Sequence, residues 1–253
     1  MLKIYESIRL DFANLDKLAL FAMLYVAFAL TCIYYLNNPK WISEILRDTP
    51  LNWFGETISN SKRSNLPQLS YWIGLVTIFY FVIPTLFLKL VFGKNLSDFG
   101  LKMNIEDGFW QLLLLCFAIM LPLIFIASLT SSFADKYPFF KIFTDEPYLG
   151  RAIIYWEIIY IFQFFCLEFF FRGFLIQSLK PSLGFYSIFV MTIPYCMIHF
   201  GKPGAEALAA IIAGVFLGWL SYTNNTIWLG LTLHCVVALT MDFLALYQKK
   251  QLF

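Results

Sequence analysis

Long apolar stretches separated by shorter polar connections are the main pattern along this chain. Stretches of about 18 to 25 apolar residues have the length that a helix needs to cross a hydrocarbon core of about 30 Å. We expect such spans at 17–36, 71–92, 109–131, 152–176, 183–200, 205–222 and 227–247. The pattern therefore predicts an all-α, polytopic membrane bundle of about seven transmembrane helices.

The composition excludes most classes of soluble protein. Hydrophobic residues make up 60% of the chain and charged residues 13%, about half the charged fraction of a soluble domain. The net charge of +2 provides no strongly basic face, so a nucleic-acid partner is not expected. All five cysteines lie in apolar stretches, which is not the pattern of a secreted disulfide framework. We therefore expect an integral membrane protein surrounded by lipid.

Polar residues within the apolar stretches become frequent in the last hundred residues. This change divides the chain into N-terminal transmembrane helices with an interfacial connection, 1–149, and a segment expected to hold the functional site, 150–247. The fourth apolar stretch contains Glu157, Glu168 and Arg172. A charge at bilayer depth costs at least ~2.5 kcal/mol, so these groups should face the protein interior or a water-filled cavity.

The spacing of these charges predicts how they relate to one another. Glu168 and Arg172 are four residues apart, so they lie on one helix face and can form an ion pair that locks the bundle. Glu157 precedes Glu168 by eleven residues and points the same way, but about 16 Å along the axis. It is therefore too far away to share a metal ion with Glu168, and we expect it to be a hydrogen-bonding acid.

The only two histidines of the chain, His199 and His234, lie in separate apolar segments. One such histidine is more often a hydrogen-bonded core residue than a ligand, but two on separate helices beside an acid suit a metal site. Catalytic zinc commonly takes three protein ligands and a water, whose proton a nearby acid can accept. We therefore expect a divalent metal, with zinc as the favoured ion, on His199 and His234, and Glu168 as the general base.

Two further acids lie near these histidines in the sequence. Glu206 falls in the first turn of the helix that follows the GKPG break, where its charge suits the helix dipole. Glu206 is therefore expected to cap this helix or to take part in catalysis, and the capping role is at least as well supported by its position. Asp242 follows His234 by two turns, about 12 Å along the helix, which is too far to bind the same ion without a helix distortion.

The order of the polar motifs resembles a known family of membrane peptidases. The motifs are Glu168-x-x-x-Arg172-Gly173 on one hydrophobic helix, then Tyr195 four residues before His199, then His234 on the last span. This order is similar to that of the CAAX-protease and bacteriocin-processing (CPBP) intramembrane peptidases, over roughly residues 150 to 245.

The resemblance implies a fold, an activity and a set of roles. It implies an all-helical membrane bundle with 150–247 as its catalytic core, and Glu168, Arg172, His199 and His234 as catalytic residues. It also implies an intramembrane metal-dependent endopeptidase acting on a hydrophobic or lipidated peptide. The HFGKPGAE string is similar to a bacterial branch, so a bacterial cytoplasmic membrane is the expected location.

The chain departs from the family pattern at two positions. The first motif of the family has two adjacent glutamates, and Leu167 replaces the first of them. The third motif has Asn or Asp four residues after the histidine, where this chain has Ala238, and Asp242 is a possible substitute one turn further on. Two alternatives therefore stay open: an inactive relative that serves as a membrane binding or immunity protein, and a transporter or proton relay. The transporter interpretation would predict corresponding interrupted segments in two halves of the chain, which the sequence does not contain.

Overall fold

The computed structural model of the chain describes residues 14–103, 108–144 and 150–249. In this part, six helical segments are long and apolar enough to cross a membrane. They are α2 (Lys17–Leu36), the continuous rod α5–η1–α6–η2 (Leu66–Val91), α7 (Phe109–Ser128), the rod α9–η4–α10 (Arg151–Leu183), α12 (Gly204–Asn224) and α13 (Trp228–Gln248). The predicted all-α membrane bundle is confirmed.

The fifth expected span, 183–200, is shorter than predicted. Its helix α11 (Tyr186–Met197) has 12 residues, which is about 18 Å of helix and too short to cross the hydrocarbon core. The chain then turns through Gly201, whose φ of 84° favours glycine, and enters α12 after Pro203. Of the seven expected spans, six are long enough to cross the membrane and one is the short helix α11, counted over the described residues. His199 lies just beyond the end of α11.

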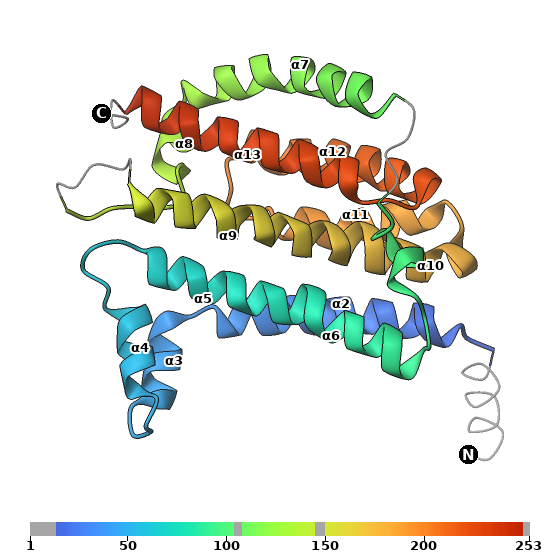
Figure 1. The fold of residues 1–253 in the computed structure, drawn as a ribbon, viewed down its shortest axis with the longest axis horizontal. Helices are drawn as coiled ribbons and strands as arrows, with labels where there is room; N and C mark the ends of the chain where they lie inside the picture. The colour runs from blue at the N-terminus through green and yellow to red at the C-terminus, as the bar shows by residue number, and fades with distance from the viewer. Residues whose placement is uncertain (1–13, 104–107, 145–149, 250–253) are drawn as a thin grey trace.

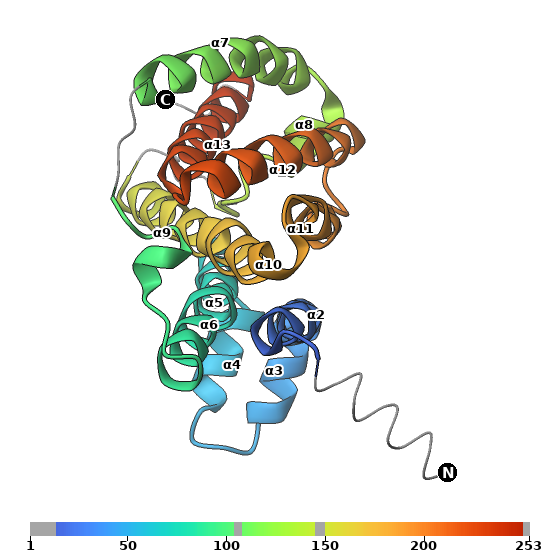
Figure 2. The ribbon, with the colours of Figure 1, turned by 90° about the vertical axis from the view of Figure 1, so that its right-hand side faces the viewer.

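The helices form layers around one central rod. Figures 1 and 2 show α9 and α10 in the middle, α2 with α5 and α6 on one side, and α11, α12, α13 and α7 on the other. Short helices lie in the connections between the spanning segments: α3 (Pro39–Leu46), α4 (Asn52–Ser59), η3 (Leu96–Phe99) and α8 (Ser131–Lys136). The central rod is the most buried of the spanning segments, which explains why it can carry charged side chains.

The middle of this rod, η4 (Phe169–Leu175), is a wide π-helical turn whose seven residues are all buried. Phe170 stacks on Tyr80 of η1 (Thr77–Val82) with ring centroids 4.2 Å apart. At Gly173 a Cβ atom would collide with the carbonyl oxygen of Phe99. The glycine of the Glu-x-x-x-Arg-Gly motif therefore lets the connection through η3 lie directly against the rod.

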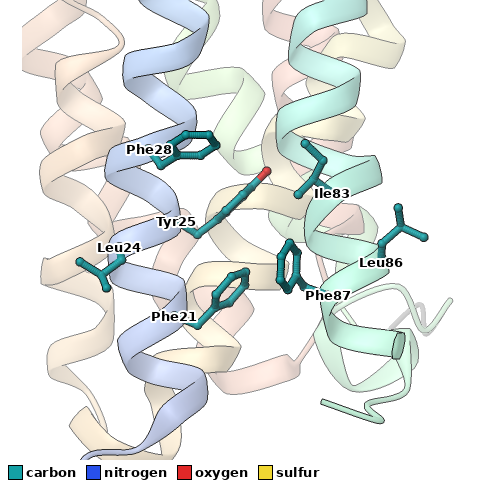
Figure 3. Close-up of a pocket in the computed structure, with 7 residues that line it drawn as sticks. All are labelled: Phe21, Leu24, Tyr25, Phe28, Ile83, Leu86 and Phe87. Carbon is teal, nitrogen blue, oxygen red and sulfur yellow. The ribbon is translucent and has the colours of Figure 1, made fainter. Parts of the chain in front are cut away.

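An apolar groove opens between α2 and the rod segment α6–η2 (Ile83–Val91), as Figure 3 shows. It has a volume of about 590 Å³ and is lined by Phe21, Leu24, Tyr25, Phe28, Ile83, Leu86 and Phe87. The Tyr25 hydroxyl donates a hydrogen bond to the Phe79 carbonyl at 2.7 Å. The groove contains no acid or histidine and lies across the central rod from α11, α12 and α13 (Figure 2). It is therefore separate from the polar site described next.

Candidate active site

Glu168, the last residue of α9, lies at the centre of a group of polar side chains and is fully buried. Its Oε1 atom is 2.6 Å from Nδ1 of His234 and 3.1 Å from Nη1 of Arg172. The expected pair of Glu168 and Arg172 on one helix face therefore forms. The contact with His234 joins the rod to α13.

Gly230 on α13 explains how the two helices come so close. A Cβ atom at this position would lie 2.6 Å from Oε2 of Glu168, so only a glycine leaves room for the carboxylate. Oε2 is buried and has no hydrogen-bond partner. A buried polar atom without a partner costs free energy, and this oxygen is therefore a free acceptor within the site.

His234 is held on both sides of its ring. Nδ1 faces the Glu168 carboxylate, Nε2 is 3.1 Å from the hydroxyl oxygen of Tyr195, and the ring stacks on Phe164 at a centroid distance of 5.2 Å. Because an ionised carboxylate only accepts hydrogen bonds, Nδ1 carries the proton that faces Glu168, and Nε2 faces the tyrosine hydroxyl. The side chain is 18% exposed, which makes it the accessible member of the pair with Glu168.

His199 lies in the turn that follows α11, and it reaches the same tyrosine. Its Nδ1 is 2.8 Å from the carbonyl oxygen of Tyr195, and the two rings are 4.8 Å apart. A carbonyl oxygen can only accept, so Nδ1 donates and Nε2 of the neutral ring keeps its lone pair. His199 therefore presents Nε2 as a free nitrogen ligand.

Arg172 completes the group from the wide turn η4. Its guanidinium carbon is 3.9 Å from the centroid of the Tyr195 ring, in a cation–π contact, and its side chain is fully buried. The backbone carbonyl of Arg172 accepts a hydrogen bond from the Ser221 hydroxyl at 3.1 Å, which ties η4 to α12. The structure thus brings Glu168, Arg172 and His234 into direct contact and joins His199 to them through Tyr195.

Glu206 and Asp242 contact other partners. Glu206 accepts a hydrogen bond from the Tyr137 hydroxyl at 2.8 Å and pairs with Lys202 at 2.7 Å. Burial, together with the nearby Glu206 carboxylate, raises the pKa of Tyr137 above its ordinary value, so the hydroxyl stays a donor. Asp242 accepts from the indole N–H of Trp156 at 3.0 Å. Neither acid has a hydrogen bond or ion pair with the four residues around Tyr195.

The donor types in the site suit zinc, although a complete ligand set is not formed. Each histidine has an acceptor at Nδ1, which is the usual way that metal-binding histidines are oriented. However, no group of three or more His, Cys, Asp or Glu side chains among the described residues is arranged to hold a metal ion. Nε2 of His234 also already faces the Tyr195 hydroxyl.

Two residues of the site were not expected from the sequence as parts of its polar network. The sequence presents Tyr195 only as the aromatic residue of a motif, and nothing in it distinguishes Gly230. The available signal for Tyr195 is its spacing of four residues before His199, which puts both on one helix face. Gly230 precedes His234 by the same spacing, but the sequence does not show that Glu168 lies opposite it.

Comparison with known proteins supports the assignment of this region. Residues 150–240 match the family model described as type II CAAX prenyl endopeptidase Rce1-like. No curated protein and no solved structure gives a match to the chain. The matched segment contains Glu168, Arg172, Tyr195, His199 and His234, and it agrees with the resemblance found in the motifs. Residues 150–240 of this integral membrane protein are therefore similar to the type II CAAX prenyl endopeptidases.

Proposed function

We propose that the chain is an intramembrane endopeptidase of the CAAX type that hydrolyses a peptide bond of a hydrophobic or lipidated protein. Glu168 and His234 are its acid–base pair. The observation that carries this proposal is the 2.6 Å contact between Glu168 Oε1 and His234 Nδ1, in a buried group inside the matched segment. Hydrolysis within a membrane needs such a polar group because the surrounding hydrocarbon offers no other acid or base.

Glu168 is proposed as the general base. Its Oε1 is committed to Arg172 and His234, so the unpartnered Oε2 is the atom that can accept the proton of an attacking water. Leu167, at the place of the absent first glutamate, is buried and has no acceptor. Glu168 therefore has to take the role that its neighbour has in the family.

Arg172 is proposed to stabilise charge during the reaction. None of its three side-chain nitrogens has a hydrogen-bond partner, although Nη1 is within ion-pair distance of Glu168. Unused donors on a buried cation can stabilise the negative charge that develops on a carbonyl oxygen when water attacks it. The cation–π contact with Tyr195 fixes the plane from which these donors point.

The proposal includes a divalent metal, with zinc as the favoured ion, on Nε2 of His199 and Nε2 of His234. The support for it is the free lone pair on His199 and the acceptor behind each Nδ1. A bound zinc ion would supply Lewis-acid chemistry and a more acidic water. On His234 the ion has to replace the contact with the Tyr195 hydroxyl.

A membrane binding protein without turnover is the second candidate function. Leu167 in place of the first acid, together with the complete burial of Glu168, favours this candidate. In such a protein, the contacts of Glu168 with Arg172 and His234 would hold the bundle around a cavity that sequesters a lipidated peptide or confers immunity to a bacteriocin. The same residues would then be needed for binding, and no bond would be cut.

Cleavage in proteoliposomes separates the two candidates. We expect the wild type to cut a prenylated peptide that ends in a CAAX sequence, and Glu168→Gln to lose at least about 100-fold in rate. Glu157→Gln is the matched control because Glu157 lies on the same helix and also has a buried, unpartnered carboxylate oxygen. Equal rates for wild type and Glu168→Gln would remove Glu168 as the base. Peptide binding by an uncleaving wild type would instead establish the second candidate.

A further inference from the structure

Tyr195 contacts all three of Arg172, His199 and His234. Tyr195 is almost completely buried. Its ring, its backbone carbonyl and its hydroxyl each make one of these contacts. The ring face lies under Arg172, the backbone carbonyl accepts from His199, and the hydroxyl bonds to His234. These contacts join η4, α11 and α13 at one point.

We propose that, in the metal-free site, the Tyr195 hydroxyl is a positioning group that fixes the orientation and the tautomer of His234. This inference rests on the proposed peptidase function, since it assigns a role within that site. The hydroxyl, the imidazole and the Glu168 carboxylate form a line of hydrogen bonds of 3.1 and 2.6 Å. In hydrolase triads a hydroxyl, an imidazole and a carboxylate stand in the same order, and there the carboxylate at Nδ1 orients the histidine.

The burial of Tyr195 limits what its hydroxyl can do. The side chain is 1% exposed, so the phenol oxygen is not placed to attack a peptide bond. Its effect has to pass through His234, whose side chain is 18% exposed. With Nδ1–H donating to Glu168 and the Tyr195 O–H donating to Nε2, the imidazole has no freedom to flip or to exchange tautomers.

The hydroxyl is the only part of Tyr195 that contacts His234 through a hydrogen bond. Tyr195→Phe therefore removes this bond but keeps the ring under Arg172 and the carbonyl that holds His199. Tyr222→Phe is the matched control. Tyr222 also has a cation over its ring, from Lys180 at 4.4 Å, and its carbonyl also accepts a hydrogen bond from that lysine.

Nitrogen NMR of the histidine side chains tests the inference directly. The chain has only two histidines, so ¹⁵N-histidine labelling gives a spectrum that His199→Ala can assign. In the metal-free wild type and metal-free Tyr222→Phe, we expect a protonated Nδ1 and a hydrogen-bonded Nε2 for His234. In Tyr195→Phe the Nε2 resonance should move toward that of a free imidazole nitrogen, or the two tautomers should mix. Unchanged His234 resonances in Tyr195→Phe would overturn the proposal.

Kinetics give a second reading of the same contact. In assays without added metal ion, we expect Tyr195→Phe to lower kcat about tenfold, the size of one hydrogen bond, with KM within about threefold of the wild type because substrate does not reach the phenol. Placing 3-chlorotyrosine at position 195 restores a hydroxyl and should restore kcat. This variant also keeps the test valid if the phenylalanine variant does not fold. Restored folding without restored kcat would count against the positioning role.

The two proposals can fail separately. If the wild type cuts no peptide but the His234 resonances respond to Tyr195→Phe, the peptidase function fails and the positioning contact stands. If the wild type cuts peptide and Tyr195→Phe matches Tyr222→Phe in both kcat and NMR, the positioning role fails and the peptidase function stands.

Discussion

Gly230 lies against Glu168 so closely that a Cβ atom on the glycine would come within 2.6 Å of the carboxylate oxygen Oε2. This close approach brings α13 to the end of α9. His234 lies one turn further along α13, and its Nδ1 atom is therefore in contact with Oε1 of Glu168. A small residue at a helix interface has this effect in membrane bundles, because two backbones can approach only where no side chain separates them.

Gly230→Ala should therefore damage both stability and the site. The added methyl group has to displace the Glu168 carboxylate, and overpacking of this kind costs about 1–3 kcal/mol of unfolding free energy. Thermal unfolding in detergent measures the loss. Gly74→Ala is the control, because a Cβ atom at Gly74 meets nothing within 4 Å. Equal stability of the two variants would contradict the tight contact at Gly230.

Arg172→Gln should be among the most destabilising substitutions in the central rod. It leaves the Glu168 carboxylate buried without its cation, and the loss of one partner of a buried ion pair costs about 3–5 kcal/mol. Lys202→Gln removes a lysine from the pair with Glu206, whose side chains are both 24% exposed, and should cost at most about 1 kcal/mol. The unfolding free energies of the two variants measure these costs. A loss of unfolding free energy for Arg172→Gln as small as that for Lys202→Gln would show that Glu168 is not held as an anion.

His199→Ala and His234→Ala should each lower the zinc content of the purified protein. The two imidazoles are the nitrogen donors of the proposed ion, so the loss of either leaves at most one of them. Metal analysis after dialysis against a weak chelator measures the stoichiometry. Glu206→Gln and Asp242→Asn are controls, because these acids bond to Tyr137 and Trp156 instead. Full metal retention by both histidine variants would remove the zinc from the proposal.

Tyr137→Phe should lower stability at neutral pH and matter less at alkaline pH. The hydroxyl bonds to Glu206, and a hydrogen bond to a charged group contributes about 1.5–3 kcal/mol. Burial raises the pKa of Tyr137 above its ordinary value of 10. The folded state therefore keeps the proton while the unfolded state loses it, so this contribution is present below pH 10 and falls as the pH rises further. Melting temperatures of the two proteins between pH 8 and 11 should converge, and a constant difference would contradict this account.

Much of the fold could be predicted from local sequence pattern. The spans are visible because an apolar stretch of sufficient length has no stable place except the membrane. The ion pair of Glu168 and Arg172 follows from helical spacing alone, which is a property of one element. The motif order also predicted the similarity to CAAX-type peptidases, and the family model matches at residues 150–240.

The remaining features depend on how helices pack against one another. The sequence by itself determined which segments lie in the membrane and which polar residues are buried there, because both follow from hydropathy and from the period of a single helix. Only the tertiary structure decided that Glu206 and Asp242 bond elsewhere, that α11 stops after 12 residues, and that Gly230 and Tyr195 bring His234 to Glu168. These outcomes depend on the rotation and separation of neighbouring helices, which are set by side-chain packing between distant segments and leave no periodic signal in the chain.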